Sequence, residues 1–283
     1  MKMRARPARV PLTHIVGLGS RLTDRDRQIA LDCYEHHVLT TNQLQRLHFA
    51  GLRTAEVRLD VLYRLRVLDR FRPPAQHGAG TAPYHWILDQ AGAYVVAEQY
   101  GIERRELKWR HATALALADS MKLRHHVEIN EFFAQLTQEV TANGGALAEW
   151  YGERTIHGLF GGAIWPDGYG VLRLPDGLPL HFLLELDRAT EPAAQLREKA
   201  KRYAKAIPRS TLARYRPVVI LAVPTAARVR AANDAIVASG APIMPAVWSK
   251  PAAGSALAIV TAAADSLAAY SPPQPPPIRA QNL

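Results

Sequence analysis

Three short amphipathic segments follow one another from Leu22 onward. Apolar residues at helical spacing predict a first helix that Thr23 can cap, a second over Asn42 to His48, and a third from about Thr54 to Leu65. The expected inward face of the first helix consists of Ile29, Ala30, Cys33 and Tyr34. Gly51 separates the second helix from the third, as expected for a residue that ends a helix.

Beyond the third helix, apolar and polar residues alternate on both sides of a Pro/Gly-rich interruption from Pro73 to Pro83, which predicts a two-stranded ribbon with a long tip. Three helices followed by such a hairpin predict a winged helix-turn-helix, whose third helix can enter the major groove of DNA. The expected groove residues are Arg53, Arg58 and Arg64, and those on the wing are Arg70, Arg72 and His77. Alternatively, this unit binds protein and its arginines form a solvated face.

The second half of the chain predicts a long helix over Asp119 to Val140 and a hairpin around the turn Leu174 to Gly177. If the hairpin loop is Pro175 to Gly177, Asp167 lies opposite Glu185 on one face, while the other face is almost entirely apolar. Further along, the pattern predicts a helix over Glu191 to Ala206, a strand in RPVVILAVP, a helix, and a strand in PIMPAVW. This order indicates a mixed α/β core.

Three acids gather at one end of this hairpin, because Asp187 joins the side of Asp167 and Glu185 by the period of two. Like charges held together need a compensating cation, so this group suggests an oxygen-ligand site for Mg²⁺ or Mn²⁺. Lys199 and Tyr203, four residues apart on the next helix, share a face, and Lys199 is the expected site lysine. The alternatives are that Asp187 and Arg188 form surface ion pairs and that Lys199 lies over the core.

Charge and composition narrow the classes of function. The 283 residues include 35 Lys and Arg against 25 Asp and Glu, a net charge of +10. Residues 1–110 contain 18 basic and 11 acidic residues, a net +7, which leaves +3 for the remainder. This excess favours a polyanion such as double-stranded DNA as partner over a membrane surface.

A single cysteine, Cys33, excludes a disulfide framework and a cysteine-built zinc site. No apolar run approaches the ~20 residues of a membrane span, so we expect a cytoplasmic protein. The expected divisions are a flexible basic arm (1–20), a winged helix domain (21–102), a linker (103–118), an α/β domain (119–270) and a proline-rich tail (271–283).

The order of RHHVEINEFFAQL, PDG, FLLELDRATE, KAKRY and RPVVILAVP resembles the replication-relaxation proteins of plasmids and integrative elements. It is also similar to the PD-(D/E)xK nuclease fold, and the likeness covers roughly Leu22 to Trp248. The resemblance implies an α/β (α+β) fold in which a winged helix-turn-helix precedes a restriction-endonuclease-like mixed-sheet domain. It also implies a role in plasmid replication, relaxation or conjugative mobilisation.

Carried over to this chain, the resemblance makes Asp167 and Glu185 the two acids of the nuclease motif. Asp187 stands where an active nuclease usually has lysine, and Lys199 could supply that amine from the next helix. Glu128 could be a further metal ligand beside Asp167, Glu185 and Asp187, and Tyr203 could position a phosphate. His125, on one helix face with Glu128, is expected to contact solvent or phosphate.

These observations favour a DNA-binding accessory protein of a mobile element that works with a relaxase or a replication protein and can form a homodimer. One alternative is a divalent-metal-dependent DNA endonuclease that acts through Asp167, Glu185 and Lys199. Another is a winged-helix transcriptional regulator whose second domain only dimerises or senses a ligand.

Overall fold

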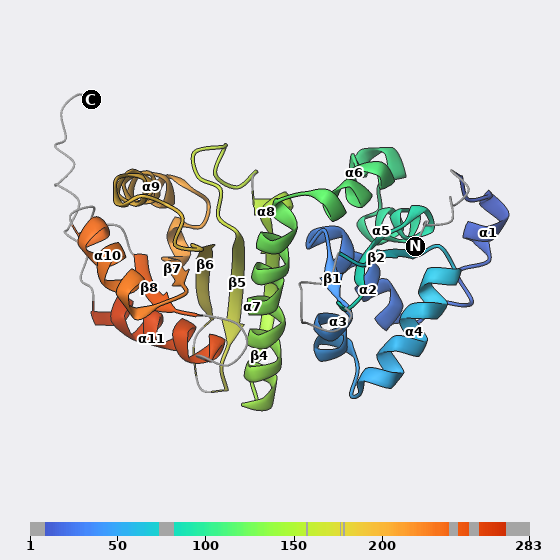
Figure 1. The fold of residues 1–283 in the computed structure, drawn as a ribbon, viewed down its shortest axis with the longest axis horizontal. Coiled ribbons are helices and arrows are strands. Elements are labelled where there is room, and N and C mark those ends of the chain that lie inside the picture. Colours follow the sequence, from blue (N-terminus) through green and yellow to red (C-terminus); the bar gives the residue numbers. More distant parts are fainter. Residues whose placement is uncertain are drawn as a thin grey trace, which may run out of the picture.

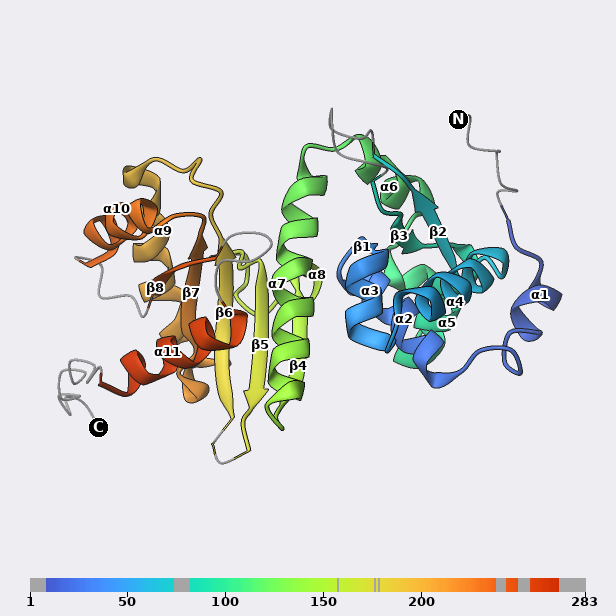
Figure 2. The same cartoon turned by 60° about the horizontal axis from the view of Figure 1, so that its bottom comes forward.

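A computed structural model shows two halves side by side, one built around a small sheet and the other around a larger one (Figures 1 and 2). It describes residues 9–73, 82–156, 158–175, 177, 179–237, 243–248 and 255–269. The fold is mixed α/β, with N-terminal helices around a small antiparallel sheet followed by a five-stranded mixed sheet. No helix of the described residues is long and apolar enough to cross a membrane.

The N-terminal half contains three consecutive helices, a three-stranded sheet and a closing helix. These elements are α2 (Asp24–Glu35), β1 (Leu39–Thr40), α3 (Thr41–His48), α4 (Leu52–Arg64), β2 (Leu68–Phe71), β3 (His85–Leu88) and α5 (Gln90–Tyr100). The strand order is β1-β3-β2 and both pairings are antiparallel, with Leu68 opposite Leu88. The expected ribbon is therefore confirmed, while its tip, including His77, lies outside the described residues.

Side-chain capping explains where the first two of these helices begin. Thr23 accepts from the backbone N–H of Asp26, whose carboxylate accepts from the backbone of Thr23 at 2.7 Å. Thr40 and Gln43 form the same reciprocal arrangement before α3. The predicted inward face of α2 is confirmed, because Ile29, Ala30, Cys33 and Tyr34 are all buried in one apolar cluster.

Two segments that the sequence assigns to an arm and a linker pack against this half. The arm contains α1 (Leu12–Val16), and the following Leu18 is buried in the core. Residues 103–118 include η1 (Arg104–Leu107) and α6 (His111–Ala116), followed by η2 (Leu117–Asp119). Leu107 and Trp109 are buried in the same core. Isolated apolar residues have no readable period, so the sequence pattern gave no sign of this packing.

The C-terminal half is a five-stranded sheet with helices on both faces (Figure 2). Its strands are β4 (Ala146–Gly152), β5 (Gly168–Arg173), β6 (Leu180–Leu186), β7 (Val218–Val223) and β8 (Ile243–Val247), in that spatial order. The first three are antiparallel neighbours, and β6, β7 and β8 run parallel. The sequence reading did not assign β4 as a strand.

Helices α7 (Lys122–Ala142) and α11 (Ala256–Ala269) cover one face of this sheet, whereas α8 (Glu153–Ile156), α9 (Ala193–Ala206) and α10 (Ala226–Ile236) cover the other. The expected hairpin register is confirmed, since Gly168 pairs with Leu184 and Leu172 with Leu180. In agreement with that register, Leu172, Phe182 and Leu184 pack together beneath α7 and α11. Residues 271–283, the expected tail, lie outside the described residues.

Helix α7 also joins the two halves. The side-chain amide of Gln43 on α3 donates to the carbonyl of Val127 at 2.9 Å and to Glu131 at 3.1 Å. Arg46 forms an ion pair with Glu131 at 2.5 Å. These contacts hold α3 of the N-terminal half against α7 of the larger sheet domain.

Candidate functional site

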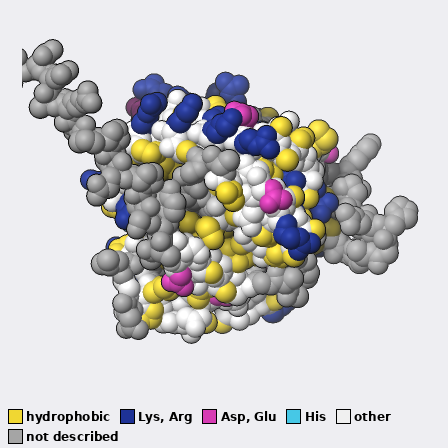
Figure 3. All heavy atoms as spheres, turned by 90° about the vertical axis from the view of Figure 1, so that its left-hand side faces the viewer, with side chains coloured by type: hydrophobic (Ala, Val, Ile, Leu, Met, Phe, Trp, Pro, Cys, Tyr) yellow, Lys and Arg dark blue, Asp and Glu magenta, His cyan; other side chains and the backbone are white. Residues whose placement is uncertain are grey.

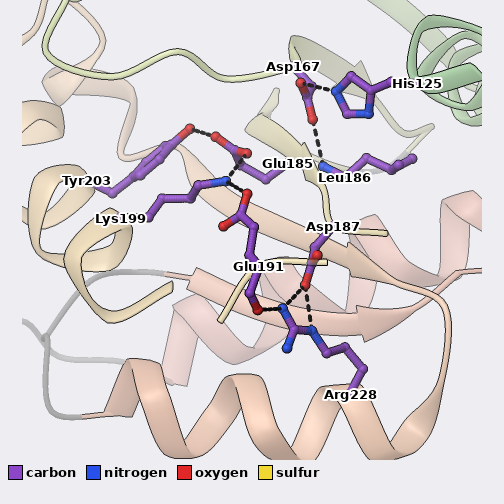
Figure 4. A network of polar contacts seen from close by, with 9 residues as sticks. All are labelled: His125, Asp167, Glu185, Leu186, Asp187, Glu191, Lys199, Tyr203 and Arg228. Carbon is purple, nitrogen blue, oxygen red and sulfur yellow. Dashed lines mark hydrogen bonds and ion pairs between the residues drawn. The ribbon is translucent and has the colours of Figure 1, made fainter. Parts of the chain in front are cut away.

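The end of the β5–β6 hairpin fixes the carboxylate of Asp167 in place. The backbone N–H of Asp167 donates to the carbonyl of Leu184 at 2.9 Å, and its Oδ2 accepts from the backbone N–H of Leu186 at 2.8 Å. Its Oδ1 lies 2.9 Å from Nε2 of His125 on α7 (Figure 4). This hydrogen bond raises the pKa of His125, so the imidazole favours its charged form beside the carboxylate.

Glu185 is a buried acid, with 6% of its surface exposed. Its carboxylate accepts from the hydroxyl of Tyr203 and from Nζ of Lys199, the latter at 3.0 Å. Burial, and then the nearby charge of Asp167, raise the pKa of Glu185 to about 7 although Lys199 and Tyr203 act in the opposite direction. A carboxyl group with such a pKa can gain or lose a proton near neutral pH.

Lys199 is held between two carboxylates. Its Nζ donates to Glu185 and, at 2.7 Å, to Oε1 of Glu191. Burial acts to lower the pKa of Lys199, but the charges and hydrogen bonds of the two glutamates outweigh it, so the pKa is raised. The lysine is therefore a fixed cation at this site, and Figure 4 shows it reaching from α9 toward Glu185 together with Tyr203.

Asp187 belongs to a separate ion pair. Its Oδ2 accepts from Nε of Arg228 on α10 at 2.6 Å, and the same guanidinium donates to the backbone carbonyl of Glu191 at 2.6 Å. Arg228 thus supplies the positive charge that Asp187 needs when buried. The resemblance to the nuclease motif places Asp187 at the usual lysine position, and in the structure its side chain is bonded to Arg228 of α10.

Glu128 makes contacts of its own on α7, with Nε of Arg124 at 2.8 Å and Nε of Arg188 at 3.4 Å. The expected four-acid ligand set is therefore not assembled: Asp167 and Glu185 interact, Asp187 pairs with Arg228, and Glu128 pairs with arginines. A divalent cation needs several oxygen ligands converging on one point. Among the described residues, that condition is not met by these acids.

A different group could hold a metal ion, namely Asp69, Asp89 and His111 in the N-terminal half. Nε2 of His111 lies 2.9 Å from Oδ2 of Asp69 and 3.6 Å from Oδ1 of Asp89. Arg66 also binds Asp89 through two nitrogens, at 2.5 Å and 3.0 Å, and already neutralises that carboxylate. Sequence reasoning missed this group, because its members lie twenty or more residues apart and form no spacing motif.

The three arginines predicted for the major groove have different surroundings. The side chains of Arg53 and Arg64 on α4 are 86% and 77% exposed. Arg58 instead donates through Nε to the buried carboxylate of Asp26 at 2.8 Å and through Nη2 to the carbonyl of Arg21 at 3.2 Å. Arg58 thus ties α4 to the start of α2, whereas Arg53 and Arg64 face outward.

The predicted wing residues lie on aromatic rings at the base of the hairpin. The guanidinium of Arg70 is 4.3 Å from the ring centroid of Tyr63 and 4.2 Å from that of Tyr84, while that of Arg72 is 3.8 Å from Tyr84. Arg72 remains exposed. Tyr203, predicted to position a phosphate, is 1% exposed and bonded to Glu185, so we do not propose it as a DNA contact.

Comparison with known proteins finds one family. The profile of the Replication-relaxation family matches residues 32–217, well over half of the chain. No curated protein and no solved structure is detectably similar to this chain. The matched segment runs from within α2 to just before β7 and therefore includes α4, the hairpin pair Asp167 and Glu185, and Lys199.

Proposed function

Because the chain belongs to the replication-relaxation family, we propose that it binds duplex DNA as an accessory protein of plasmid or mobile-element replication, relaxation or conjugative mobilisation. In this proposal the N-terminal half is a winged helix-turn-helix, in which α4 enters the major groove and the β2–β3 hairpin is the wing. The C-terminal half is a restriction-endonuclease-like domain. A relaxase or a replication protein of the same element is the expected protein partner.

The outward face of α4 is the observation that carries this proposal. Arg53, Val57, Asp60 and Arg64 fall at helical spacing on one stripe, and the first, second and fourth are exposed. Helix α3, not α4, packs against α7, so the C-terminal half leaves this stripe accessible. The guanidinium groups of Arg53 and Arg64 can therefore reach phosphates or base edges.

Fluorescence anisotropy with a labelled duplex and the full chain tests the proposal. We expect Arg53→Ala/Arg64→Ala to weaken binding at least about tenfold and to reduce the slope of log affinity against log salt by about 2. A matched control, Arg105→Ala/Arg110→Ala, removes the same charge from exposed positions outside α4 and should bind like wild type. An affinity that is insensitive to salt, or an equal loss in both variants, would contradict the proposal.

The ion-paired group of Asp167, Glu185 and Lys199 favours a second function, DNA cleavage. Two interacting acids and a fixed amine on a nuclease-like sheet fit the roles of that reaction, although the metal ligand set is not assembled. Supercoiled plasmid incubated with the protein and Mg²⁺ or Mn²⁺ tests it. Nicking that Asp167→Asn and Glu185→Gln both abolish supports an enzyme. Intact plasmid under conditions in which the protein binds supports the accessory role.

A further inference from the structure

Helix α9 carries a second basic surface, far from α4. Its outward side presents Arg197, Lys201, Arg202 and Lys205, and Arg209 follows in the 3-10 turn η3 (Ile207–Arg209); all five are exposed. Figure 3 shows Lys and Arg side chains in a row along one edge of this end of the molecule. The inward side of the same helix carries Lys199 and Tyr203, which reach Glu185. The inward side of α9 therefore contacts Glu185, while its outward side presents positive charge to solvent.

Few acidic side chains neutralise the positive charges of this surface. Glu198 is the one acid on the outward side of α9, and it pairs with Lys201 at 2.7 Å. Within the described part of the chain, Arg202, Lys205 and Arg209 form no ion pair with an acid. Like charges held close together without counter-charges attract an anionic ligand.

A cavity of about 530 Å³ opens beside these three residues. One part of its lining comes from α9 and the turn after it, and the other from the segment before β5: Arg202, Lys205, Ala206, Arg209 and Ser210, and Leu159, Phe160, Gly161 and Ala163. Among the residues that the structure describes, no acidic side chain lines this cavity. Basic groups on one wall and apolar groups on the other focus positive potential into the hollow, which suits a phosphate group.

We propose that this surface, Arg197 to Arg209 with its cavity, binds the phosphate backbone of a DNA segment separate from the one bound by α4. Arg197, Lys201 and Lys205 span about 12 Å along the helix, a distance over which one DNA strand presents about three phosphates. A row of this length suits a polyanion better than a single small anion.

A lipid surface fits this face less well. The outward residues of α9 include Ala193, Ala194 and Gln195 besides the cations, and no bulky apolar side chain that could enter a bilayer. Helices α9 and α4 lie at opposite ends of the long axis of the molecule (Figure 1). One protein would thereby hold two DNA segments. This inference rests on the proposed function, because it takes DNA as the ligand.

The test uses the full chain and a labelled duplex of random sequence. The starting protein is Arg53→Ala/Arg64→Ala, in which binding by α4 is already weakened. Adding Arg202→Ala/Lys205→Ala/Arg209→Ala should lower the remaining affinity at least about tenfold and reduce the salt slope by about 3. Adding Arg105→Ala/Lys108→Ala/Arg110→Ala, which removes the same charge elsewhere, should leave both unchanged. Equal affinities in the two five-residue variants would overturn the inference.

Two further arms separate this inference from the proposed function. If the α9 substitutions weaken binding in the otherwise wild-type protein while Arg53→Ala/Arg64→Ala has no effect, the α9 surface stands and the α4 proposal does not. Phosphatidylserine vesicles provide the second arm. A loss of vesicle binding with unchanged DNA binding in the α9 variant would overturn the choice of DNA. Thermal unfolding of every variant should match wild type, because all the replaced side chains are exposed.

Discussion

Asn130 of α7 binds His36 at the end of α2 through both ends of its side-chain amide. Its Oδ1 lies 2.9 Å from Nδ1 of His36, and its Nδ2 donates to the carbonyl of His36 at 3.1 Å and to that of Val38. The residue is buried, so these bonds connect the two halves of the molecule away from water.

Replacement of this amide should therefore destabilise the protein. We expect Asn130→Ala to lower the free energy of unfolding by about 3 kcal/mol, because buried carbonyl and imidazole groups lose their partners. Urea unfolding measures the change. Asn143→Ala, at the C-cap of the same helix, is the matched control, since Asn143 is exposed and bonds only within its own turn. It should cost less than about 1 kcal/mol. Equal losses would contradict a specific role for Asn130.

His37 makes stability depend on pH. Burial, followed by the charges of Arg154 and His126, lowers the pKa of His37 to about 3, and Arg154 donates to its Nδ1 at 3.0 Å. The unfolded chain takes up a proton near pH 6.5 and the folded chain does not, so stability is full above pH 6.5 and falls as the pH drops toward 3. Asn tolerates the positive φ of 64° at this position.

When the pH is lowered from 7.5 to 4.5, the free energy of unfolding of the wild type should fall. We expect the fall to be about 2 kcal/mol smaller in His37→Asn. Urea unfolding at several pH values provides the comparison. Parallel curves for the two proteins would show that His37 is not the responsible group.

Arg58 and Arg53 both lie on α4, but we expect their replacement to affect different properties: stability for Arg58 and duplex binding for Arg53. Arg58→Ala leaves the carboxylate of Asp26 buried without its cation, so we expect a loss of about 2 to 3 kcal/mol of stability. Arg53→Ala should change stability by less than about 0.5 kcal/mol, because its pair with Glu56 is exposed. Paired measurements of thermal unfolding and duplex binding separate the two roles. If Arg58→Ala weakened duplex binding without lowering stability, Arg58 would be a DNA contact in the major groove after all.

We expect Lys199 to stabilise the protein chiefly by neutralising the buried carboxylate of Glu185. Lys199→Met removes the cation beside a buried carboxyl group, and we expect a loss of about 3 kcal/mol. The double variant Glu185→Gln/Lys199→Met should recover much of it, as a double-mutant cycle can show. Lys201→Met is the control, since its pair with Glu198 is exposed. Additive losses in the cycle would mean that the two residues do not interact.

Gly170 in β5 has no room for a side chain. An added Cβ would lie 2.4 Å from the ring of Phe182 and 3.2 Å from that of Trp150. We expect Gly170→Ala to cost about 2 kcal/mol through this overpacking. Gly158→Ala, where the nearest contact is at 3.9 Å, should cost much less. Similar unfolding midpoints for the two variants would show that the rings at Gly170 move aside freely.

Local sequence patterns were sufficient to predict a large part of the fold. Thr23 and the apolar spacing after it determined where α2 begins and which side is buried, because capping and helical period act within a few residues. The turn before Gly177 likewise set the register of β5 and β6, since the side-chain period of a strand is two and a slip of one residue would have exposed Leu172 and Leu184.

The order of residues along the chain is thus enough to tell which side chains share a face. Examples are the inward faces of the N-terminal helices, the hairpin that brings Asp167 opposite Glu185, and the side of α9 that carries Lys199. Most of the charge pairs became visible only in the folded molecule. Asp187 pairs with Arg228, and Arg58 pairs with Asp26. A further group brings together side chains from three elements: Asp69, Asp89 and His111. Periodicity assigns a side chain to a face, but its partner depends on distances between segments far apart in the chain, which packing sets.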